Sequence, residues 1–104
     1  MEDFKKIKKF ADEIFSRYRI YRFKCDNIAN KYVCSEKDKI YEIHNFCETI
    51  ENILSKMKRE YATLLRKFNI DLVDRYELGY AGSTFYYKYR AAVNNFLEYF
   101  NASN

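Results

Sequence analysis

Three cysteines and one histidine are the residues of this chain that are best suited to metal binding or nucleophilic chemistry. Cys25, Cys34, Cys47 and His44 make up the donor set of a Cys3His zinc site. Structural zinc sites take their cysteines in closely spaced pairs, and none of these cysteines has a neighbour at that spacing. The pattern therefore predicts no metal, and instead buried or incidental thiols in a reducing compartment, without a disulfide framework.

Catalytic groupings are equally sparse. His44 and Cys47 are three positions apart, which on a helix permits a Cys-His dyad, but no third orienting group or oxyanion-binding loop accompanies them. Asp71 and Asp74 share one face of a short predicted helix, where carboxylates normally complement the positive helix start. Phosphate-binding glycine loops and zinc-protease motifs do not occur. The sequence predicts that the protein is not an enzyme and has no cofactor.

Basic residues alternate with aromatic and aliphatic residues in the segment from Arg17 to Lys24. Such a segment can follow a phosphate backbone while its rings stack on bases. The alternative is a helix that packs one face and lays its arginine and lysine stems across the rim of the contact. Both interpretations stay open at this point, and both assume a helix because no turn residue marks a hairpin.

Charge is distributed unevenly along the chain. The net charge is +4, with nine basic and five acidic residues in positions 1–34 but three basic and four acidic residues in positions 69–104. Four lysines, Lys5, Lys6, Lys8 and Lys9, lie together near the N-terminus. They are either a source of phosphate contacts or a solvated charged surface.

The composition favours long helices in one domain. The chain has 104 residues, no proline and two glycines, and 48% of its residues are apolar. This length suits a single domain over residues 1–104, and the apolar share is enough for a core. No apolar run approaches the roughly 18 residues of a membrane span. We therefore expect a cytoplasmic protein without a membrane segment.

Two heptad patterns predict two helices of about 30 residues, because apolar residues recur at spacings of three and four. The first runs from Phe4 to Tyr32 and the second from Ile40 to Phe68. A turn near Ser35 would fold them into an antiparallel hairpin over residues 1–68, with Cys25 against Cys47 and Phe4 beside Phe68. Further aromatic residues lie outside the seams and require a third packing partner: Phe10, Phe15, Phe23 and Phe46.

The C-terminal segment predicts a helix-turn-helix over residues 69–101. A short helix over 69–76 would have Asn69 as its cap, the glycines Gly79 and Gly82 would form the turn, and Ser83 would cap the last helix. The expected buried face of that last helix comprises Phe85, Tyr89, Ala92, Val93, Phe96 and Phe100. The predicted fold is thus all-α, a long antiparallel hairpin with a helix-turn-helix packed at its open end.

Residues 77–100 resemble a known family. The segment Glu77–Tyr80, then Thr84–Tyr86, and later Ala92, Val93 and Phe96 are similar to the recognition end of sigma-factor region 4-like helix-turn-helix domains, particularly phage transcriptional regulators of the ArpU and RinA type. The resemblance implies a helical N-terminal part and a DNA-reading helix near the C-terminus. It places the following residues in the major groove: Ser83, Thr84, Tyr86, Tyr87, Lys88 and Arg90.

Two functional hypotheses follow. The first is a transcriptional regulator that binds double-stranded DNA through the last helix, with Lys5, Lys6, Lys8 and Lys9 as phosphate contacts and the hairpin as a scaffold or as the dimerisation element of a homodimer. The second is a non-enzymatic protein-interaction module, such as a phage-type inhibitor, an immunity protein or an adaptor, which would use its surplus aromatic residues. Buried Tyr86, Tyr87 and Lys88 would argue against the first.

Overall fold

Helices make up nearly all of the computed structural model, which describes residues 2–28 and 37–103. In chain order these are α1 (Glu2–Ile28), α2 (Lys37–Lys56), α3 (Arg59–Leu65), the π-helical turn η1 (Arg66–Ile70) and α4 (Gly82–Ser103). The residues described include no strand. The all-α prediction is confirmed, and the basic-aromatic segment from Arg17 to Lys24 is helical within α1.

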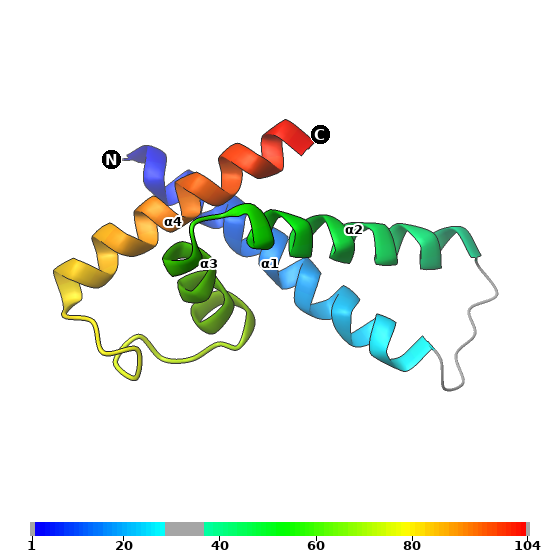
Figure 1. The fold of residues 1–104 in the computed structure, drawn as a ribbon, viewed down its shortest axis with the longest axis horizontal. Coiled ribbons are helices and arrows are strands. Elements are labelled where there is room, and N and C mark those ends of the chain that lie inside the picture. Colours follow the sequence, from blue (N-terminus) through cyan, green and yellow to red (C-terminus); the bar gives the residue numbers. More distant parts are fainter. Residues whose placement is uncertain (1, 29–36, 104) are drawn as a thin grey trace.

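Helices α1 and α2 run antiparallel, pack against each other through the second half of α1, and diverge toward the end of α1 and the start of α2 (Figure 1). The Tyr18 hydroxyl donates a hydrogen bond to Glu51, and the Tyr21 ring meets the Phe46 ring edge-on at 5.4 Å. This register brings the Cys25 and Cys47 thiols together, as the heptad pattern predicted. The turn expected at Ser35 lies outside the described residues.

The second predicted helix is interrupted, so the expectation of one helix through Phe68 was wrong. Helix α2 ends at Lys56, and Lys58 adopts an extended conformation with φ −55° and ψ 131° before α3 begins. The break changes the direction of the chain sharply (Figure 1). It allows α4 to pack against both pieces, since the Tyr99 hydroxyl approaches the Lys56 carbonyl oxygen at 3.5 Å and Lys88 pairs with Glu60 at 3.1 Å.

Helix α4 supplies the third packing partner for two of the four surplus aromatic residues, Phe10 and Phe15. Phe15 is fully buried against Phe96 with ring centroids 4.7 Å apart, and Phe10 meets Phe100 at 6.1 Å. The predicted inner face of α4 is confirmed, except that Phe100 is half-buried and Leu97 is buried as well. Burial of these rings, together with the aliphatic residues of the core, stabilises the fold.

The short helix predicted over residues 69–76 is absent. The chain leaves α3 through η1, where the Asp71 amide donates to the Arg66 carbonyl at 2.8 Å, and Leu72 then takes a left-handed φ of 58° that stops the helix. Asn69 is not a cap but a buried side chain. Residues 75–79 form turns instead, and α4 begins at Gly82, one residue before the expected cap Ser83.

The two glycines before and at the start of α4 have different roles, which a pair of substitutions can separate. Gly79 has a φ of +81°, whereas Gly82 has a helical conformation, and a Cβ at either position would meet nothing within 4 Å. We expect Gly79→Ala to lower the free energy of unfolding by about 1–2 kcal/mol through backbone strain. Gly82→Ala should raise it by about 0.5–1 kcal/mol. Urea unfolding measures both, and equal effects would contradict this assignment.

Candidate nucleic-acid interface

The first turns of α4 present a polar and aromatic face to solvent. Ser83 and Thr84 are exposed, and Tyr87 is 73% exposed. Phe85 and Tyr89, which point the opposite way, are buried and stack on each other with centroids 5.4 Å apart. Because the inner face is fixed by these rings, the outer face is held in a constant orientation, as a surface that reads a groove requires.

Phe4 connects the N-terminus of α1 to this part of α4. Its ring meets Tyr86 at 5.6 Å and Tyr89 at 6.5 Å, both edge-on, and the Arg90 guanidinium lies over it at 5.4 Å. The sequence predicted Phe4 beside Phe68, and the two rings do share a neighbour, since Phe68 meets Tyr89 at 5.1 Å. The lysines that follow Phe4 therefore lie beside the first turns of α4.

The predicted site residues differ in their exposure to solvent and in whether they have an intramolecular partner. Lys5, Lys6 and Lys9 are exposed, whereas Lys8 is half-buried and pairs with Asp12 at 2.8 Å. Tyr86 is 45% exposed because one edge rests on Phe4. The structure thus brings the α1 lysines and the α4 residues to one end of the molecule, with three of the four lysines directed to solvent.

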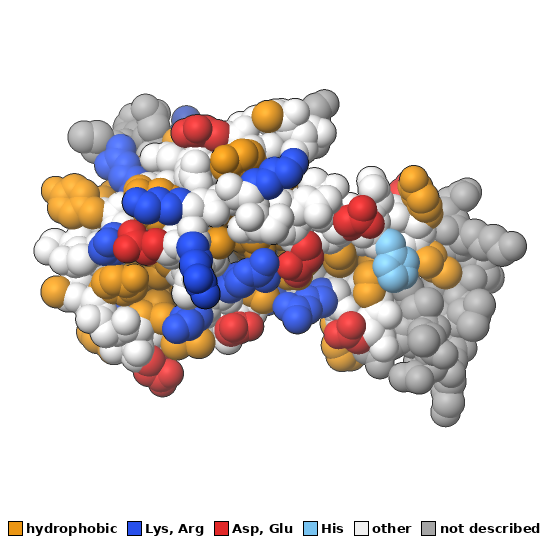
Figure 2. All heavy atoms as spheres, in the orientation of Figure 1, with side chains coloured by type: hydrophobic (Ala, Val, Ile, Leu, Met, Phe, Trp, Pro, Cys, Tyr) orange, Lys and Arg blue, Asp and Glu red, His pale blue; other side chains and the backbone are white. Residues whose placement is uncertain are grey.

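The two basic residues of α4 lie on opposite flanks of its exposed face. On one flank, Lys88 is half-buried and forms an ion pair with Glu60 of α3. On the other, Arg90 is half-buried over Phe4 of α1. Both were expected to face the groove openly, and each instead has an intramolecular partner. Basic and acidic side chains are interspersed over the visible face of this end of the molecule (Figure 2).

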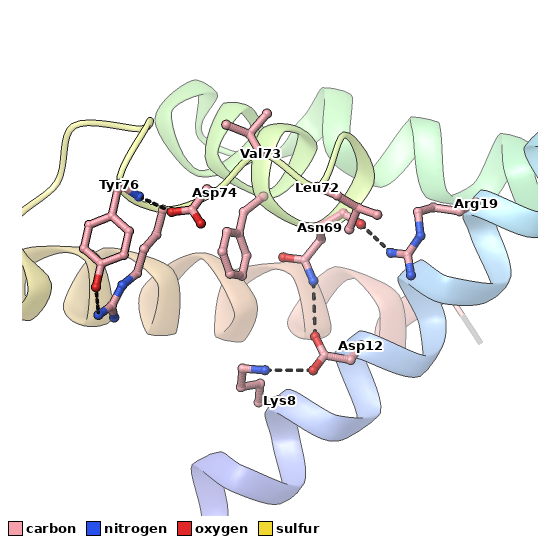
Figure 3. A pocket seen from close by; sticks show the side chains of 10 residues that line it. Lys8, Asp12, Arg19, Asn69, Leu72, Val73, Asp74 and Tyr76 are labelled. Carbon is pink, nitrogen blue, oxygen red and sulfur yellow. Dashed lines mark hydrogen bonds and ion pairs between the residues drawn. The ribbon is translucent and has the colours of Figure 1, made fainter.

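A polar cavity of about 540 Å³ lies between α1 and the segment that follows η1 (Figure 3). At its inner side the side-chain amide of Asn69 donates a hydrogen bond to the Asp12 carboxylate at 3.2 Å. The Arg19 guanidinium donates to the backbone carbonyl oxygen of Asn69 at 2.5 Å. Arg75 and Tyr76 line its outer side. Sequence reasoning missed this cluster, because nothing local marks Asn69 as buried once it is taken for a helix cap.

The Tyr89 hydroxyl is buried beside this cluster and lacks a hydrogen-bond partner among the described residues. Burial raises the pKa of the Tyr89 phenol above its usual value, and the neighbouring Asp12 carboxylate acts in the same direction. The folded state therefore holds this proton more tightly than the unfolded chain does. The stability associated with the neutral phenol is fully present below about pH 10 and is lost as the pH rises above that value.

This linkage predicts a pH effect that depends on one hydroxyl. Between pH 10 and pH 11, wild-type protein should lose about 1 kcal/mol of stability relative to Tyr89→Phe, because phenylalanine has no proton to lose. Chemical denaturation at several alkaline pH values measures the difference. Tyr87→Phe is the matched control, since its exposed ring should leave the pH dependence unchanged. Parallel pH profiles for wild-type and Tyr89→Phe would show that the phenol is not buried.

Comparison with protein-family models, with curated protein sequences and with solved structures finds no match for this chain. Among the described residues, no three His, Cys, Asp or Glu side chains are arranged to hold a metal ion. None of the helices described here is both long and apolar enough to cross a membrane.

Proposed function

We propose that this protein binds double-stranded DNA and regulates transcription, with the first half of α4 entering the major groove. Ser83, Thr84 and Tyr87 supply groups that contact base edges, and Tyr86 lies at the border of this surface. Lys5, Lys6 and Lys9 contact phosphates on the flanking backbone, and Lys8 adds a fourth charge once it is released from Asp12.

One observation supports this proposal above all others. Phe4 packs against Tyr86, Tyr89 and Arg90, so the most basic segment of the sequence lies at the start of the helix that resembles a recognition helix. Residues 69–104 carry more acidic than basic residues and could not hold DNA alone, because nucleic-acid affinity depends largely on phosphate contacts. The Phe4 contact supports the proposal, because the lysine-rich segment begins directly after Phe4.

The arrangement that presents α4 differs from the helix-turn-helix expected from the sequence. Residues 71–74, which lie directly before the turn over residues 75–79, are not helical. Helix α4 is instead held by contacts with α1 and α3. The turn itself retains a left-handed glycine, Gly79, and the Asp74 carboxylate accepts a hydrogen bond from the Tyr76 amide at 2.8 Å. In this proposal, α1 replaces the missing first helix as the element that contacts the DNA backbone.

The salt dependence of binding tests the role of the lysines. We expect wild-type protein to bind a duplex of mixed sequence with an affinity that falls steeply as salt rises, measured by fluorescence anisotropy. Each phosphate contact contributes about 0.9 to the slope of log affinity against log salt. The triple variant Lys5→Gln, Lys6→Gln, Lys9→Gln should therefore show a slope smaller by about 2–3.

A matched variant removes charge from the other end of the same helix. Arg22→Gln with Lys24→Gln changes two exposed residues that lie far along α1 from Phe4, so its effect on the slope, per charge removed, should be small. Equal effects per charge at the two ends would mean that net charge alone governs binding. Absence of binding by wild-type protein at low salt would contradict the proposed function.

A second candidate function is protein interaction through the opposite end of α1 and α2. Ile20 and Phe23 on α1 and Tyr41 on α2 are 52%, 69% and 73% exposed. Hydrophobic side chains are visible at this end of the molecule (Figure 2). Exposed groups of this kind favour a protein partner, including a second copy of the chain in a homodimer. Binding of this kind would persist at high salt, unlike DNA binding.

A further inference from the structure

The sulfur-containing side chains between α1 and α2 are not used by the proposed DNA contact. Cys25 of α1 and Cys47 of α2 are both half-buried free thiols, and Cys25 lies near enough to Cys47 to help raise the pKa of its thiol. The Cys25 sulfur is also 3.5 Å from Nδ1 of His44, one turn before Cys47 on α2. Two thiols and a proton acceptor thus meet where the two helices face each other.

We propose that Cys25 and Cys47 are a reversible modification site, which hydrogen peroxide converts to an intramolecular disulfide with His44 accepting the Cys25 proton. The antiparallel contacts between Tyr18 and Glu51 and between Tyr21 and Phe46 fix the register that keeps the two sulfurs opposite each other. The site differs from an isolated cysteine, because both partners of the disulfide and a base are already in contact.

The chemistry proceeds in two displacements that balance. The Cys25 thiolate attacks one oxygen of the peroxide, the O–O bond breaks, and the released hydroxide takes a proton to become water, which leaves Cys25 as a sulfenic acid. The Cys47 sulfur then loses its proton and attacks the Cys25 sulfur, and the S–O bond breaks with release of a second water. Two thiols are oxidised by two electrons, and one peroxide is reduced to two waters.

The surroundings give the two cysteines different roles. Burial, with the neighbouring Cys25 as a further cause, raises the pKa of the Cys47 thiol to about 11, so Cys47 remains protonated at neutral pH. Cys25 has the imidazole of His44 beside it and can pass its proton to that ring. Cys25 is therefore the attacking residue and Cys47 the resolving one.

The experiment uses the full chain and hydrogen peroxide as the oxidant. After oxidation, remaining thiols are alkylated under denaturing conditions and the digested protein is examined by mass spectrometry. We expect one peptide pair linked through Cys25 and Cys47, an alkylated Cys34, and a melting temperature raised by about 10 °C that dithiothreitol reverses. A disulfide that includes Cys34, a link between two chains, or oxidation without a disulfide would overturn the proposal.

Three variants test the assigned roles without relying on stability alone. Cys47→Ser should leave a sulfenic acid on Cys25 that dimedone traps, whereas Cys25→Ser should give neither a disulfide nor a trapped product. His44→Gln should slow disulfide formation by about tenfold or more, because general-base assistance is lost. Asn45→Gln is the exposed neighbouring control and should react at the wild-type rate. Equal trapping of both cysteines by dimedone would contradict the roles assigned to Cys25 and Cys47. Equal rates of disulfide formation in His44→Gln and Asn45→Gln would contradict the role of His44 as a base.

Discussion

Phe96→Ala is expected to lower the free energy of unfolding by about 3–5 kcal/mol, a large part of the 5–15 kcal/mol typical of a domain. The Phe96 side chain has no exposed surface, and its ring lies against Phe15 of α1 and Phe100 of its own helix. Its removal leaves a cavity between α1 and α4 that rigid helices cannot close. Urea unfolding followed by circular dichroism measures the loss.

An aromatic residue on the outer face of the same helix provides the control. Tyr87 is 73% exposed, and Tyr87→Ala should change the stability by less than about 1 kcal/mol. The contrast between the two substitutions tests how α4 is oriented on α1. If Tyr87→Ala were as destabilising as Phe96→Ala, α4 would be rotated relative to the structure, and its proposed reading face would be buried.

Replacing Thr84 and Tyr87 together by alanine should lower the affinity for the preferred DNA site by about 100-fold. Each side chain is exposed on the first turns of α4, and a good base contact is worth about 1–3 kcal/mol of discrimination. The preferred site is obtained by in vitro selection from a random duplex library with wild-type protein. Binding of the double variant to random duplex at low salt should stay within about threefold of wild type, since the phosphate contacts remain.

A matched pair of substitutions tests whether the position along α4 matters. Asn94 and Asn101 are exposed on the second half of the helix, and Asn94→Ala with Asn101→Ala should keep the wild-type site preference. If this pair weakened site-specific binding as much as the Thr84 and Tyr87 pair, the first half of α4 would not be the reading surface. If neither pair did so, α4 would not read the groove at all.

Much of the helical structure could be predicted because apolar spacing records burial directly. The seam residues of α1, the inner face of α4 and the apposition of Cys25 and Cys47 follow from periodicity alone. The need for a third packing partner, either the C-terminal segment or a second subunit, was also evident because Phe10 and Phe15 lie off the seam, and in the structure α4 contacts both. Local pattern and tertiary packing agree at these positions.

The break after α2 and the missing short helix could not be predicted, because both depend on packing between distant segments. The heptad spacing from Leu54 through Met57 to Tyr61 is continuous, and neither glycine nor proline interrupts it. The two helices on either side of the break both contact α4. Asn69 looks like a helix cap in the sequence, but in the structure it is buried and hydrogen-bonded to Asp12 and Arg19 of α1. Residue spacing within residues 69–76 cannot reveal contacts with α1.

The interface could be predicted in part. The proximity of the α1 lysines to α4 was expected from the hairpin geometry, and the Phe4 contacts place them there. The partners of Lys88 and Arg90 were not expected, because Glu60 lies on α3, beyond the break at Lys58, and because the sequence paired Phe4 with Phe68 and not with Arg90. A basic side chain that is expected to be exposed can thus have an ion-pair or cation–π partner on another helix.

The most direct test of the proposed function is a nuclear magnetic resonance titration of ¹⁵N-labelled protein with a duplex of mixed sequence at low salt. We expect the duplex to change the amide chemical shifts mainly in residues 82–90 of α4 and residues 5–9 of α1. Changes confined to residues 20–24 and 41, at the opposite end of the molecule, would contradict DNA reading by α4, and so would a spectrum that the duplex leaves unchanged.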